Sequence, residues 1–183
     1  MRRITKRKPP PPLDRATLDQ LALSYVGRFA TTRARLKSYL ERKLRERGWD
    51  GAPDPDTAAI VERFAARGYV DDAAYALSKS RSLTSRGYGP KRVEQSLRTA
   101  GVEEGDGAAA RELAHTDCVT SALRFAERRR IGPFASHPPD PKARERALAA
   151  MIRAGHGFTL ARAIVDLPPG AEIDLETLAD RVV

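Results

Sequence analysis

One short pattern recurs three times along the chain and constrains the fold more than any other feature. Each copy has two apolar residues four positions apart, followed four positions later by a glycine: Leu40, Leu44 and Gly48; Val93, Leu97 and Gly101; Ala147, Met151 and Gly155. A spacing of four places two side chains on one face of a helix, and a glycine after the last turn supplies the left-handed conformation that commonly ends a helix. Because the copies lie about fifty residues apart, the pattern predicts three copies of one helical unit.

The central copy carries its own start and stop signals. Gly89 can serve as the N-cap, and Pro90 then takes the first helical position, where a missing N–H group costs nothing. Gly101 ends the helix, and Val102 returns the chain to the core. We therefore expect residues 89–101 to form the middle helix of the second unit.

The helical spacing of apolar residues extends each copy to three helices. The predicted helices span about residues 18–29, 32–48 and 57–68, then 71–83, 89–101 and 106–115, and finally 117–130, 140–155 and 158–167, with a weak helix at most after residue 175. No period-two alternation is sustained, so no strand is predicted. The expected fold is all-α, with tandem three-helix repeats stacked into an elongated, curved array.

These boundaries divide the chain into five segments. We expect a disordered, basic, proline-rich arm at residues 1–16, three-helix repeats at 17–68, 69–116 and 117–168, and a C-terminal tail at 169–183. The arm places five basic residues before a run of four prolines, a composition typical of an extended, solvated chain. Such an arm either stays in solvent or adds contacts to phosphate groups.

The chain is strongly basic, with 33 lysines and arginines against 24 acidic residues and a pI near 10.1. Such a balance favours an anionic partner. Basic residues gather at corresponding places in the three units: Arg33, Arg35, Lys37, Arg42 and Lys43; Lys79, Arg81, Arg86, Lys91 and Arg92; Arg124, Arg128, Arg129 and Arg130. A single charged residue usually only solvates a helix exterior, but stacked units would align these groups into one stripe that binds the partner or DNA.

The residues that commonly carry catalysis are scarce. The three histidines, His115, His137 and His156, lie far apart, and the one His-x-x-Cys pair, His115 with Cys118, lacks the second pair of a zinc site. The adjacent carboxylates Asp71 and Asp72 lie at a predicted helix start, where capping is favoured over metal binding. We therefore expect no catalytic residue, no metal site and no cofactor.

The single cysteine excludes an internal disulfide framework and fits a reducing compartment. No segment approaches the roughly 20 apolar residues of a membrane span. We accordingly expect a cytoplasmic protein that does not enter a membrane, with Cys118 as a buried thiol.

Three motifs together carry a family resemblance. They are Gly-Tyr-Val-Asp-Asp at 68–72 with Tyr75 and Ala76, Arg-Gly-Tyr-Gly-Pro-Lys-Arg-Val at 86–93 with Leu97, Gly101 and Val102, and Arg-Arg-Arg-Ile-Gly-Pro-Phe at 128–134. In these motifs the chain resembles the RecX family of bacterial recombination regulators over about residues 18–167. It departs from the family in having Gly-His-Gly-Phe at 155–158, where a tighter Gly-Phe junction is usual.

The resemblance implies both a fold and a function. The family is built from tandem three-helix repeats, and its members bind the RecA recombinase in the groove of the RecA filament on single-stranded DNA. They restrain filament extension, strand exchange and the coupled ATPase. We therefore expect a non-enzymatic, monomeric regulator of RecA that meets single-stranded DNA through the filament.

One alternative from another class is a freestanding DNA-binding or transcriptional protein that uses a helix-turn-helix-like unit. Asparagine is absent and glutamine occurs only at Gln20 and Gln95, so side chains that read bases through amides are few. This composition favours the RecA regulator over sequence-specific readout.

Overall fold

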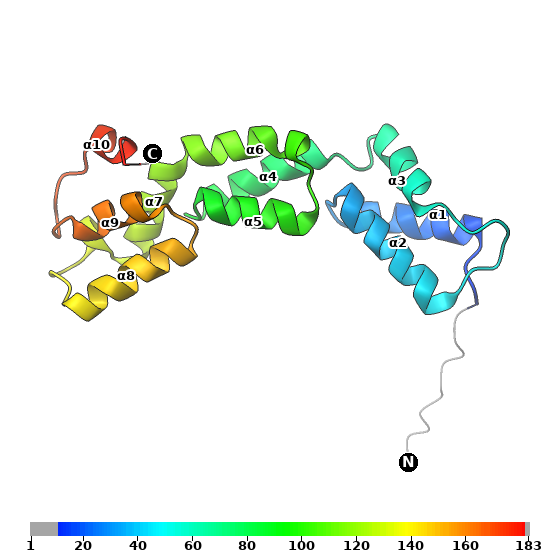
Figure 1. Ribbon diagram of the computed structural model, residues 1–183, viewed down its shortest axis with the longest axis horizontal. Helices are drawn as coiled ribbons and strands as arrows, with labels where there is room; N and C mark the ends of the chain where they lie inside the picture. The colour runs from blue at the N-terminus through cyan, green and yellow to red at the C-terminus, as the bar shows by residue number, and fades with distance from the viewer. Residues whose placement is uncertain (1–10, 182–183) are drawn as a thin grey trace, which may run out of the picture. The chain divides into compact units, whose positions relative to one another are not determined.

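The computed structural model describes residues 11–181, and all regular secondary structure within that range is helical (Figure 1). The chain divides into two compact units, one ending at Asp71 and one beginning at Asp72. The first unit contains one three-helix repeat, and the second contains two. The prediction of an all-α fold built from three-helix repeats is thus confirmed.

The first unit contains α1 (Arg15–Val26), α2 (Arg33–Arg47) and α3 (Thr57–Ala66). The three helices begin in the same way, because Asp14, Thr32 and Asp56 each accept a hydrogen bond from the backbone N–H three residues later. The core between them is made of fully or almost fully buried side chains: Leu13, Leu18, Ala22, Leu36, Leu40, Ile60, Val61, Phe64 and Val70.

The first repeat begins earlier than the sequence predicted. Residues 1–10 of the expected arm lie outside the described residues, but Leu13 is fully buried and bonds on both sides to the end of α2. Its N–H donates to the Gly48 carbonyl oxygen at 3.0 Å, and its own carbonyl oxygen accepts from the Asp50 N–H at 2.8 Å. The boundary therefore falls near Leu13 instead of residue 17, since this leucine completes the core beside the turn that ends α2.

The second unit begins with the second repeat, α4 (Asp72–Thr84), α5 (Pro90–Ala100) and α6 (Glu104–Thr116). Its core is rich in alanine, which lets α4 and α6 pack closely. Ser80 of α4 is fully buried there and donates its hydroxyl proton to the Ala110 carbonyl oxygen of α6 at 2.7 Å. The signals of α5 are confirmed, because Gly89 and Pro90 start the helix and Gly101 ends it with a φ of 69°.

The third repeat contains α7 (Cys118–Arg129), a short 3-10 helix η1 (Gly132–Phe134), α8 (Pro141–Arg153) and α9 (Phe158–Asp166). The expected weak tail helix is α10 (Leu175–Ala179), which packs on α7 and α9. Its residue Leu178 is only 4% exposed and belongs to the core of this repeat. The tail is thus part of the third repeat as far as the structure describes it.

Two glycine-containing loops join the second and third repeats through their backbones. The N–H of Gly89 donates to the Ala154 carbonyl oxygen at 2.9 Å, and the N–H of Lys91 donates to the Gly155 carbonyl oxygen at 3.1 Å. A Cβ atom at Gly89 would overlap that Gly155 oxygen, and one at Gly87 would lie 2.9 Å from the backbone nitrogen of Phe125. The start of α5 therefore docks on the end of α8 only because these positions lack side chains. We call this contact the glycine junction.

His156 fills the space behind the glycine junction. Its ring is 1% exposed, and Nε2 lies 3.1 Å from the Gly87 carbonyl oxygen. A carbonyl can only accept, so Nε2 carries the proton and Nδ1 is bare, and Nδ1 has no hydrogen-bond partner. Burial lowers the pKa of His156, and the bond to Gly87 opposes this shift only in part. The residue that interrupts the family pattern is therefore a neutral spacer between two repeats.

Substituting Gly89 tests the close approach at the glycine junction. We expect Gly89→Ala to lower the midpoint of thermal unfolding by several degrees, as a loss of about 1–3 kcal/mol gives in a domain of this size. Gly105→Ala is the matched control, since a Cβ there meets nothing within 4 Å. Circular dichroism should show that Gly105→Ala leaves the midpoint unchanged or raises it. Equal midpoints for the two variants would contradict the packing argument.

The pH dependence of the free energy of unfolding tests whether His156 is neutral in the folded protein. Because folding lowers the pKa of this group, the unfolded chain binds the extra proton first as pH falls below the ordinary value near 6.5. Stability should be unaffected by this group above that pH and should fall below it by up to about 1.4 kcal/mol per pH unit. Urea unfolding between pH 7.5 and 5 should show this slope reduced in His156→Gln and kept in the exposed control His137→Gln. The same slope in both variants would assign the effect to other groups.

Candidate partner-binding surface

Four of the five basic residues predicted in the first unit lie within ion-pair distance of a carboxylate. Arg42 and Lys43 both contact Glu46, at 2.9 and 2.6 Å, and the pKa of Glu46 is lowered chiefly by its hydrogen bond from Lys43. Arg33 lies 3.7 Å from Glu62 on α3, and Lys37 lies 4.0 Å from Glu41. Arg35 also has an interaction partner. This group therefore presents a mixed rather than a purely positive surface.

The basic residues of the second unit are in a different electrostatic setting. Among residues 11–181, no carboxylate lies within ion-pair distance of the members of the second and third groups. All are exposed except Lys79, which is half-buried on α4. Their positive charge is therefore not compensated locally, and an incoming anion would meet it directly.

Aromatic rings hold four of these arginines in place. The guanidinium carbons of Arg86 and Arg92 lie 5.5 and 6.0 Å from the centre of the Tyr88 ring. Those of Arg128 and Arg129 lie 5.7 and 5.8 Å from the centre of the Phe125 ring. A cation over an aromatic face is stabilised and loses some rotamer freedom, so each ring orients two positive charges.

The glycine junction brings these two pairs of arginines together. Gly87 lies against the backbone of Phe125, and Arg128 Nη1 donates to the carbonyl oxygen of Arg86 at 2.6 Å. Arg86 is itself held by a bond from its Nε to the Ser82 carbonyl oxygen at 2.9 Å. We call Arg86, Arg92, Arg128 and Arg129, with the rings of Tyr88 and Phe125, the junction cluster.

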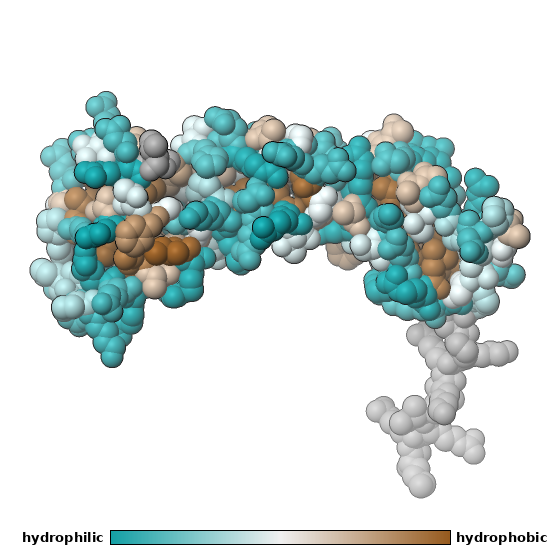
Figure 2. Space-filling view, viewed as in Figure 1, coloured by the Kyte–Doolittle hydropathy of each residue, from teal (hydrophilic) through white to brown (hydrophobic). Residues whose placement is uncertain are grey.

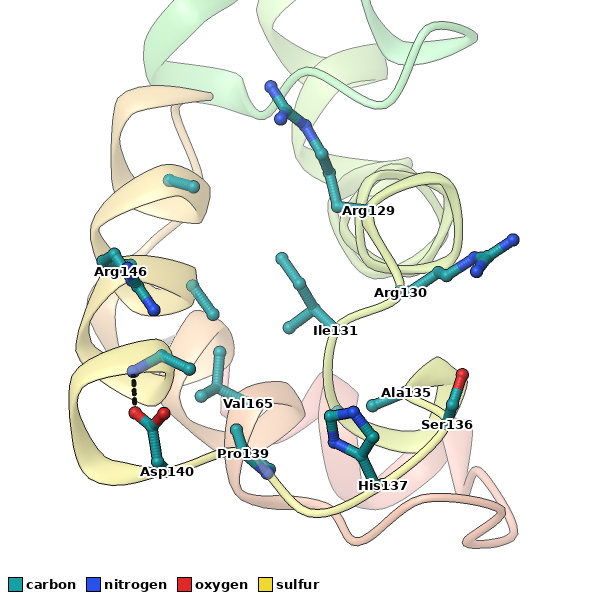
Figure 3. A pocket seen from close by; sticks show the side chains of 14 residues that line it. Arg129, Arg130, Ile131, Ala135, Ser136, His137, Pro139, Asp140, Arg146 and Val165 are labelled. Atoms are coloured by element: carbon teal, nitrogen blue, oxygen red, sulfur yellow. Dashed lines mark hydrogen bonds between the residues drawn. The ribbon is translucent and has the colours of Figure 1, made fainter.

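The remaining residues of the predicted groups do not join the junction cluster through any contact in the described part of the chain. Lys79 and Arg81 lie on α4 and Arg124 lies on α7, whereas Lys91 lies beside Arg92 at the glycine junction. The side chain of Arg130, just after α7, points away from α8 (Figure 3). The five basic residues of the first unit belong to a separate compact unit. Alignment of all three groups into one stripe therefore stays a prediction.

Sequence reasoning missed the aromatic partners of the arginines. Tyr88 lies between Arg86 and Arg92 in the sequence, and Phe125 comes three and four residues before Arg128 and Arg129. A spacing of three or four on a helix is the signal that could have paired Phe125 with both.

Figure 2 shows hydrophilic side chains over most of the visible face of α5 and α6, and hydrophobic ones gathered over α8 and α9.

The described residues give no support to a metal site, a membrane span or a reactive thiol. No group of three or more histidine, cysteine, aspartate or glutamate side chains is placed to hold a metal ion in residues 11–181. Over the same range, every helix is too short or too polar to cross a bilayer. Cys118 is buried, as predicted, and burial raises the pKa of its thiol, which disfavours the nucleophilic thiolate.

Comparison with known proteins relates this chain to several proteins of the same name. Residues 71–110 match the family model described as RecX, second three-helix domain. The chain is 32% identical to the regulatory protein RecX of Myxococcus xanthus, over 83% of this chain and 86% of the relative. It is 33% identical to the regulatory protein RecX of Mycobacteroides abscessus, over 85% of this chain and 76% of the relative.

A solved structure shows the same fold. The crystal structure of RecX from Lactobacillus salivarius superposes with a TM-score of 0.59 at 19% identity, covering 82% of this chain and 93% of that one. The same family is indicated by the repeated helical units, by the motifs at residues 68–72, 86–93 and 128–134, and by the identities over most of both chains. The chain belongs to the RecX family of regulatory proteins.

Proposed function

We propose that the protein binds the RecA recombinase and its filament on single-stranded DNA in the cytoplasm, and that binding inhibits filament extension, strand exchange and ATP hydrolysis. The observation that carries the proposal is the junction cluster, in which four arginines without a carboxylate within ion-pair distance in residues 11–181 lie together on one compact unit of two repeats. Membership of a family whose relatives are named regulatory proteins supports a regulatory role.

Binding alone is sufficient for the proposed inhibition. A filament presents the same subunit surface repeatedly, so a chain of repeats can make several modest contacts whose combined strength exceeds that of any one. The junction cluster would face an acidic surface of RecA or the phosphates of the DNA that the filament encloses. We propose a single chain as the active species and no chemical step of its own.

The alternative of a freestanding helix-turn-helix protein is less well supported. In such proteins the N-terminal residues of the recognition helix reach the bases in the major groove. Here the start of α5 is docked on the third repeat through the N–H groups of Gly89 and Lys91. The backbone at the start of this helix therefore faces the third repeat, and only the exposed side chains of Lys91 and Arg92 remain open to a duplex.

Charge reversal in the junction cluster tests the proposal. We expect Arg86→Glu/Arg92→Glu to raise the concentration needed for half-inhibition of the RecA ATPase on single-stranded DNA by about tenfold or more, since like charges that face each other across an interface cost several kcal/mol. The matched control is Arg45→Glu/Arg98→Glu, which makes the same change in net charge on exposed residues outside the predicted groups. Thermal unfolding should confirm that both variants fold.

Two results would count against the proposal. Equal inhibition by both double variants would remove the junction cluster from the interface. A wild-type protein that leaves the ATPase unchanged at saturation, while binding free oligonucleotides with a steep salt dependence, would favour the freestanding DNA-binding protein.

A further inference from the structure

A hollow lies in the third repeat, next to Arg129 of the junction cluster. It has a volume of about 510 Å³ and lies between the end of α7 with η1 on one side and α8 on the other (Figure 3). Its volume is in the range of sites that bind small molecules or peptide side chains. The residues that line it differ between the floor and the rim.

The floor is apolar because of a run of small residues on α8. Ala143, Ala147 and Ala150 recur at spacings of four and three, so they share one face of the helix and leave the space in front of them open. Ile131, just before η1, and Val165 of α9 close the hollow and are 7% and 4% exposed. Nothing in the described chain fills this apolar surface.

The rim is positively charged. Arg129 extends over one end of the opening, Arg146 projects from α8, and His137 lies at the other end (Figure 3). Neither arginine has a carboxylate within ion-pair distance in residues 11–181. The one acidic residue in the lining, Asp140, is engaged as the cap of α8, where it accepts from the Ala143 N–H at 2.6 Å.

We infer that this hollow receives an apolar side chain of RecA that is flanked in its own sequence by carboxylates. The apolar floor disfavours a bare anion, and the two uncompensated arginines disfavour a purely apolar ligand. A nucleobase is disfavoured as well, since His137 at the rim is the only aromatic ring in the lining, and no amide side chain lines the hollow to read the edge of a base. The inference rests on the proposed function for the identity of the partner, but the chemistry of the hollow stands without it.

The hollow can be tested with a probe that is independent of RecA. A fluorescein-labelled pentapeptide in which glutamate alternates with leucine should bind the full-length protein saturably, as measured by fluorescence anisotropy. The same peptide with lysine in place of glutamate should bind at least about tenfold more weakly. Ala147→Trp, which fills the hollow, and Arg146→Glu, which reverses its rim, should each weaken binding of the acidic peptide by about tenfold.

Each variant has a matched control. Ala149→Trp adds the same side chain to a half-buried position of α8 outside the hollow, and Arg153→Glu reverses an exposed charge of α8 that does not line it. Both controls should keep affinity for the peptide within about twofold, and circular dichroism should show all four variants folded. Failure of the wild-type protein to bind the acidic peptide, or equal binding by Ala147→Trp, would overturn the inference.

The RecA filament and an oligothymidylate supply the second and third probes. Ala147→Trp should weaken binding to the filament and leave binding to the oligothymidylate unchanged. Loss of oligothymidylate binding alone would make the hollow a base pocket and overturn the inference. Binding of the acidic peptide by a protein that does not bind RecA would retain the hollow as a peptide site and overturn only the proposed function.

Discussion

The structure of the second unit depends on the backbone contact between two glycine-containing loops. Gly89 at the start of α5 meets Gly155 after α8, and Gly87 meets the backbone of Phe125 on α7. The approach is so close that N–H and carbonyl groups of different repeats bond directly. Repeat proteins are stabilised by such nearest-neighbour interfaces. Here the interface includes a fully buried, neutral histidine, His156. The second and third repeats therefore pack as one compact unit.

This contact also places the charged groups. It brings the arginines over Tyr88 next to those over Phe125, and Arg129 at the edge of the junction cluster is also on the rim of the hollow in front of α8. The rings of Tyr88 and Phe125 orient the guanidinium groups. Since no carboxylate in residues 11–181 lies within ion-pair distance of them, these groups can bind an anionic partner. In the first unit, by contrast, Glu46 on α2 and Glu62 on α3 lie within ion-pair distance of three of the predicted basic residues. Similar composition therefore gives two different surfaces.

Local signals foretold the helices well because each start and stop depends on neighbours in sequence. The pattern glycines Gly48, Gly101 and Gly155 all have positive φ, as the spacing required. Contacts between distant residues were not foreseen. Leu13 was assigned to a disordered arm although it completes a core, and pairing of Arg33 with Glu62 or of Arg128 with the Arg86 carbonyl depends on how helices meet. Charge counts locate basic segments, but only packing decides which charges are compensated.

The central claim is that the second and third repeats present one rigid, arginine-bearing surface to RecA. Hydrogen–deuterium exchange of the protein, free and saturated with RecA filaments on single-stranded DNA, tests it most directly. The account predicts that amides of the segments around residues 86–92 and 124–130 become protected together. Protection confined to the first unit, or to one of these two segments without the other, would contradict it.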